Sequence, residues 1–183
     1  AQAAAMAMGR AMDDVIITAA SANAFTGETG ATSTAAQTAI AAGGAGLTIA
    51  KLRTAKQTFD IGDVDPSIPR HIVVSPEQIT NLLATTEVTS SDFNTVKALV
   101  QGEIDSFLGF KFTVSNRLAK SGNDRTCIAF AQDGITLAIG KDVSARIDER
   151  ADKSYATQVY YCQSIGATRM EEAKVLGIVC QEA

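Results

Sequence analysis

The chain has 183 residues, is 46% hydrophobic and carries a formal net charge of -4 at pH 7. This length and apolar content exclude a disordered chain and can supply the core of one globular unit or two small ones. The acidic balance opposes general nucleic-acid binding, which relies on Lys and Arg to neutralise phosphates, and no run of 18 apolar residues predicts a membrane span.

Two helices are predicted in the first third of the chain. Residues 1–22 are rich in Ala and carry an apolar stripe at helical spacing. The stripe consists of Met8, Met12, Val15 and Ala19. No capping residue precedes Ala1, so the sequence is expected to open inside a helix, with a further N-terminal region before it. The Gly-rich residues 23–46 predict a surface loop with a short helix at 34–42, and a second amphipathic helix is predicted over 47–59.

The middle of the chain mixes strands and helices. Two prolines within residues 63–70 predict an extended connector and a domain boundary, because Pro disfavours helix in the residue before it. An apolar strand is predicted at 71–74. A capping box that starts at Ser75 then predicts a helix over 76–84. Apolar residues at steps of three and four predict another helix through 93–107.

Further strands are predicted at 110–115 and 126–131. Residues 135–139 fit either a strand or a short helix, and residues 143–147 fit an extended segment. Helices and strands that alternate irregularly in this way are typical of the α+β class.

The last part of the chain organises the predicted fold. A charged connector at 142–153 precedes two long strands, 157–168 and 174–181, which are joined by a polar turn at 169–172. A lone hairpin is only marginally stable in water, so we expect both strands to pack on the helix at 1–22. The chain would then leave one platform, build a second domain and return.

The charged connector supplies the candidate site. Its interleaved charges fit a solvated surface segment, a set of salt bridges between neighbouring subunits, or an acid/base pair of an enzyme. The candidate intersubunit contacts are Arg146, Asp148, Glu149, Arg150, Asp152 and Lys153.

No motif predicts catalysis or a bound cofactor. Cys127, Cys162 and Cys180 lack metal-ligand spacing and are expected to be buried thiols in a reducing compartment. The single histidine, His71, has no Cys, Asp or Glu at ligand spacing. The segment around Ser164 lacks the first Gly of the hydrolase nucleophile elbow. We therefore predict a non-enzymatic protein without metal or cofactor.

Three long segments resemble the major capsid protein of tailed bacteriophages with the HK97-like fold. They are AMGRAMDDVIITA at 7–19, the region 87–118 around SDFNTVKALVQGEID, and the region 128–180 around KDVSARIDERADKSYATQVY. The resemblance covers most of the chain and rests on long segments instead of a short motif. The N-terminal arm and extended loop of that family have no counterpart in this sequence.

The resemblance implies an α+β fold with a spine helix and a peripheral domain made of residues 1–60 and the return strands 153–183. Residues 61–152 would form an axial domain. It also implies a virion protein, assembled in the host cytoplasm, whose hexameric and pentameric capsomers close an icosahedral shell. This shell would enclose DNA without sequence-specific binding and would not involve a membrane. Scaffold, portal or decoration proteins would be further partners.

Three other hypotheses stay open from the sequence. An encapsulin-like cargo shell would use the same fold. An intracellular enzyme with an unrecognised site would need a concave pocket with convergent polar groups. A tail or adaptor protein of the virion is the third.

Overall fold

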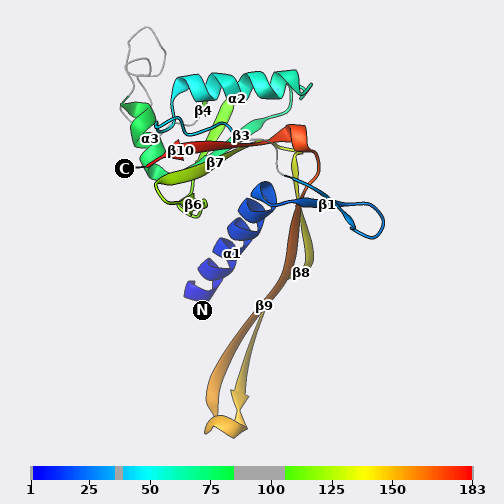
Figure 1. Cartoon of the computed structure of the whole chain (residues 1–183). Coiled ribbons are helices and arrows are strands. Elements are labelled where there is room, and N and C mark those ends of the chain that lie inside the picture. The colour runs from blue at the N-terminus through cyan, green and yellow to red at the C-terminus, as the bar shows by residue number, and fades with distance from the viewer. Residues whose placement is uncertain (1, 36–38, 85–105, 183) are drawn as a thin grey trace.

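The computed structural model describes residues 2–35, 39–84 and 106–182, which form a sheet-based body with a long projecting β-hairpin (Figure 1). The helical elements are α1 (Gln2–Ser21), α2 (Ile49–Ile61), α3 (Pro76–Leu83), η1 (Ala151–Lys153) and η2 (Glu172–Lys174). The strands are β1 (Ala24–Thr26), β2 (Thr32–Thr34), β3 (Arg70–Val74), β4 (Ser106–Phe107), β5 (Phe110–Val114), β6 (Lys120–Ser121), β7 (Asp124–Ala131), β8 (Ile135–Arg150), β9 (Ala156–Arg169) and β10 (Val175–Gln181). The predicted α+β class is confirmed.

Six strands form the sheet of the body. Their order is β10-β7-β3-β5-β4, with β6 also paired to β7. β3 and β5 run parallel, and the other pairs are antiparallel. β3 follows its predicted apolar pattern, because alternate residues from Arg70 to Val74 are fully buried and the others are partly buried.

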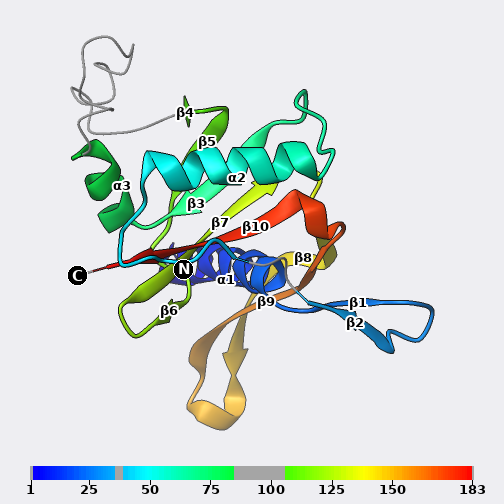
Figure 2. The same cartoon turned by 45° about the horizontal axis from the view of Figure 1, so that its top comes forward.

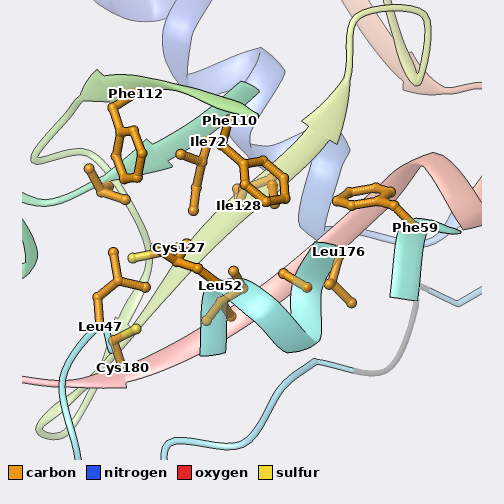
Figure 3. Close-up of a cluster of buried hydrophobic side chains, with 14 of the residues drawn as sticks. Leu47, Leu52, Phe59, Ile72, Phe110, Phe112, Cys127, Ile128, Leu176 and Cys180 are labelled. Atoms are coloured by element: carbon orange, nitrogen blue, oxygen red, sulfur yellow. The ribbon is translucent and has the colours of Figure 1, made fainter. Parts of the chain in front are cut away.

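The core lies between the sheet and α2, which crosses one face of it (Figure 2). The ring centroids of Phe59 and Phe110 are 6.0 Å apart, and Leu52, Ile72 and Leu176 are buried around them (Figure 3). Burying a side chain of this size contributes about 1.5–3 kcal/mol. This apolar contact fixes α2 to the sheet.

The capping residue predicted for α3 is confirmed. The Ser75 side chain accepts a hydrogen bond from the backbone N–H of Gln78 at 3.4 Å. The Gln78 side chain does not complete the capping box. It accepts from the Leu47 N–H at 2.6 Å and donates to the Gln181 carbonyl at 3.2 Å, so it connects three distant segments.

Two predictions outside the hairpin have different outcomes. The prediction of a short helix at 34–42 is wrong for those of its residues that the structure describes. Thr34 ends β2, and Ile40 forms a parallel bridge with Ile178. The helix through 93–107 lies outside the described residues up to 105, and its last residue, Phe107, lies in β4.

Both C-terminal strands exist, but their predicted pairing with each other is wrong. β9 pairs with β8, so residues 135–139 and 143–147 belong to one 16-residue strand. β10 pairs with β7 instead. β10 is the terminal strand of the sheet, and its mostly apolar side chains are buried in the core of the body, whereas most of β9 is exposed or only partly buried. Of the two strands, β9 is the one that packs on α1.

The domain boundaries predicted at 1–60, 61–152 and 153–183 stay a prediction. The contacts described above favour a different division, because α2 and β10 pack in the body and β8 pairs in the hairpin. Among the described helices, none has the length and hydropathy of a membrane span.

Candidate assembly surface

The β8–β9 hairpin, which we call the arm (residues 135–169), carries the candidate contact residues. It projects from the sheet, and η1 closes its tip (Figure 1). The predicted charged connector is therefore wrong as an element, because residues 142–150 are the outer half of β8. The structure brings the candidates together on the outer part of the arm, residues 141–164, which we call the outer arm. All six are exposed there. They are Arg146, Asp148, Glu149, Arg150, Asp152 and Lys153.

One ion pair lies at the tip. The Arg150 guanidinium donates to the Asp152 carboxylate, with Nε 2.9 Å from Oδ1, and this hydrogen bond lowers the pKa of Asp152. In the described part of the chain, the other four candidates make no ion pair. The exposed pair between Arg150 and Asp152 contributes little to folding. The other four charged side chains could pair with charges of another molecule. Their role as intersubunit contacts stays a prediction.

The strand register gives the outer arm two faces. Ser144, Arg146 and Asp148 lie opposite Cys162, Tyr160 and Gln158, and these six residues share one face. We call this the polar face. With Lys141 they surround a shallow hollow of about 440 Å³. A surface of this kind suits polar contact with a partner.

Cys162 carries the thiol of the polar face. Its Sγ lies 3.0 Å from Ser144 Oγ. Hydrogen bonds from Ser144 and Lys141 favour the thiolate and lower the pKa of Cys162. The prediction of three buried thiols is therefore wrong for Cys162, which is half-buried, and confirmed for Cys127 and Cys180. The sequence could not predict this, because its Ser144 partner lies on the facing strand.

Arg169 fixes the base of the arm. Its side chain is buried, and Nη1 donates to the Ala22 carbonyl at 2.9 Å and to Ala20 at 3.4 Å. Nη2 donates to the carbonyls of Thr34 at 3.0 Å and Ala35 at 2.9 Å. One guanidinium thus joins the C-terminus of α1, the end of β2 and the arm. The sequence predicts Arg169 in a polar turn, and no local pattern marks this role.

A second contact joins α1 to the body. Arg117, in the loop after β5, donates two hydrogen bonds to the Asp14 carboxylate. The hydrogen bond from Arg117 is the main cause that lowers the pKa of Asp14. Because this ion pair is exposed on both sides, it orients α1 more than it stabilises the fold.

Among the described residues, neither the hollow beside α1 nor the surroundings of His71 bring together the groups of a catalytic site. A hollow of about 520 Å³ between α1 and β9 has a mainly apolar lining that includes Val15, Phe25 and Ala167. His71 stacks on Phe130 with ring centroids 5.6 Å apart. Within residues 2–35, 39–84 and 106–182, no group of three or more His, Cys, Asp or Glu could hold a metal ion.

Comparisons with solved structures identify the fold. The chain is similar to a structure from Mycobacterium phage Che8, with 18% identity and a TM-score of 0.67 over 97% of this chain and 61% of that one. The capsid structure of cyanophage P-SCSP1u shares 16% identity, with a TM-score of 0.65 over 100% and 66% of the two chains. The capsid asymmetric unit of cyanophage Pam1 shares 12% identity, with a TM-score of 0.70 over 100% and 68%.

The chain thus spans 61% and 66% of the first two of these solved chains. No curated protein sequence matches it. The family model described as phage capsid protein matches residues 1–182, nearly the whole chain. This match and the structural likeness confirm the resemblance that was stated from the sequence. The chain belongs to the phage capsid protein family and has the HK97-like fold.

Proposed function

We propose that this chain is the shell-forming subunit of a phage major capsid protein and that its copies associate through the arm. The observation that carries the proposal is the arm itself, whose outer half has every candidate contact residue exposed. A two-stranded ribbon is marginally stable alone, so contact with a neighbour would complete it. Weak contacts suffice, because a closed lattice multiplies them.

We also propose a division of the chain into two parts, which the contacts between its elements support. The peripheral part would be α1, the β1–β2 hairpin and the arm, and the axial part would be the sheet with α2 and α3. We propose hexameric and pentameric capsomers in an icosahedral shell that encloses DNA in the virion, without a catalytic role. Assembly in the host cytoplasm, with scaffold or portal proteins, belongs to the same proposal. The family match favours this function over a cargo shell or an enzyme.

Charge reversal on the outer arm tests the proposal. Arg146→Glu and Arg150→Glu are each expected to lower the yield of closed particles from the full chain by about tenfold, because each replaces a favourable intersubunit charge with a repulsive one. Folding should change by less than about 1 kcal/mol, since both side chains are exposed. Electron microscopy gives the yield, and urea unfolding gives the stability.

Arg53→Glu is the matched control. Arg53 is exposed on α2, and its reversal changes the net charge of the chain by the same amount. It should leave the yield near that of the wild type. Full yield from both arm variants would remove these arginines from the contacts, and a wild-type chain that forms no particles or capsomer rings would refute the function.

A further inference from the structure

The face of the arm opposite the polar face carries an apolar patch, with Glu149 and Thr157 next to it toward the tip. Ala145 lies opposite Tyr161, and Ile147 lies opposite Val159. Because side chains alternate along a strand, these four residues point away from Arg146 and Tyr160. We call them the apolar face. The two extra residues of the register shifts lie in β8, so β9 alternates without interruption from Val159 to Arg169.

The helix α1 covers only the inner part of this same face. Arg169 and Ala167 share the parity of Tyr161 and Val159 along β9, and the Arg169 side chain reaches the carbonyls at the C-terminus of α1. Ala167 and Ile165 are partly buried. Farther out, Val159 is 46% exposed and Ile147 is 69% exposed. The apolar face therefore continues a surface that is covered near the body and bare near the tip.

The tip adds strain and an exposed aromatic ring. Ser154 and Tyr155 have φ values of 52° and 57°, in the left-handed region that Gly adopts without penalty. Non-Gly residues there cost about 1–3 kcal/mol each, so a side chain at this position is retained at the expense of stability. Tyr155 is 72% exposed. Tyr is enriched at the energetic centres of protein interfaces.

Charge decides which partner fits. Residues 141–164, the outer arm, contain four basic and four acidic side chains, so this segment is neutral while the rest of the chain carries the net charge of -4. A neutral surface of mixed sign does not attract nucleic acid, which needs an excess of Lys and Arg. It also does not repel a second copy of itself, since each charge can meet an opposite one.

We infer that the apolar face and Tyr155 dock against a second copy of this chain and supply most of the contact free energy of the arm, with the charged residues setting register at the rim. This inference rests on the proposed function and deepens it, because it names the partner and the face. The sequence predicted only the charged residues of this segment as candidate contacts, and the apolar face adds to them. Apolar and aromatic anchors usually dominate an interface, and exposed charges contribute little.

Two variants of the purified full chain test the inference, without added nucleic acid or protein. The double variant Ile147→Ser/Val159→Ser removes the apolar face, and we expect the lowest concentration at which particles form to rise at least about tenfold. Tyr155→Gly removes the ring and also relieves the left-handed strain. It should unfold at the same or a higher urea concentration than the wild type and still assemble at least about tenfold less well.

Ile61→Ser is the matched control, because Ile61 is 74% exposed at the end of α2 and lies outside the arm. It should assemble within about threefold of the wild type. If the apolar-face variants assemble like the wild type, or if Ile61→Ser loses as much as they do, the assignment of the face is wrong and the proposed function stands. A defect that appears only when nucleic acid or another protein is added overturns the second copy as partner. A wild-type chain that never assembles refutes both proposals.

Discussion

Replacing Arg169 by Met is expected to lower the free energy of unfolding by about 3–4 kcal/mol. The guanidinium is buried and donates to four backbone carbonyls, those of Ala20, Ala22, Thr34 and Ala35. Two of these, at Ala20 and Ala22, lie at the C-terminal end of α1, where a positive charge also opposes the negative end of the helix dipole. Met fills the space but removes all four hydrogen bonds, of which the one to Ala20 is buried and the other three are partly buried. Urea unfolding of the unassembled chain measures the change.

Arg169→Lys keeps the positive charge of the side chain but not its arrangement of hydrogen-bond donors. A single ammonium group cannot serve two pairs of carbonyls at once, so Lys should recover only part of the loss. Arg150→Met, at the exposed tip, is the matched control and should cost less than about 0.5 kcal/mol. If Arg169→Met lowers the free energy of unfolding by less than 1 kcal/mol, the hydrogen bonds of Arg169 do not hold the arm to α1.

Glu182→Gln is expected to cost about 3 kcal/mol at pH 7. The Glu182 side chain is buried and accepts a hydrogen bond from Ser75 Oγ at 2.6 Å. Its carboxylate also lies 2.8 Å from Arg125 Nε and 3.1 Å from Lys120 Nζ. Burial alone would raise the pKa of Glu182, but these hydrogen bonds outweigh it and lower the pKa to about 2. The charged form is therefore the one that the fold stabilises.

The pH dependence follows from this direction. The stabilisation is fully present above the ordinary glutamate pKa of about 4.5 and is lost as the pH falls from there toward 2. The stability gap between the wild type and Glu182→Gln should therefore shrink over that window. Glu171→Gln removes an exposed partner of Lys174 and should show almost no gap at any pH. A Glu182→Gln gap that is the same at pH 7 and pH 3 would contradict this account.

Local signals predicted the elements of this fold better than their partners. The Ala-rich stripe of α1 and the cap at Ser75 act within a few residues, so both could be read from the sequence. The pairing of β10 could not, because its neighbour β7 lies about fifty residues earlier and the turn at 169–172 favoured the nearer strand.

The candidate site was predicted in part for the same reason. The run of charges at 146–153 is contiguous, and its exposure on the arm could be expected. Arg169 and Glu182 looked like ordinary polar residues at strand ends. Their partners lie roughly 60 to 150 residues away in sequence, and no local pattern marks such contacts. The apolar face could not be predicted either, because it forms only where Ala145 and Ile147 of β8 pair with Tyr161 and Val159 of β9.

Hydrogen exchange of the arm tests the central claim most directly. The amides of residues 143–161 are to be compared in the unassembled full chain and in assembled particles, by mass spectrometry of their peptides. A two-stranded ribbon opens easily when alone, so these amides should exchange quickly before assembly and at least about tenfold more slowly in the particle. The buried strands β3 and β7 should be protected in both states. Equal exchange of the arm in the two states would show that copies of the chain do not meet through it.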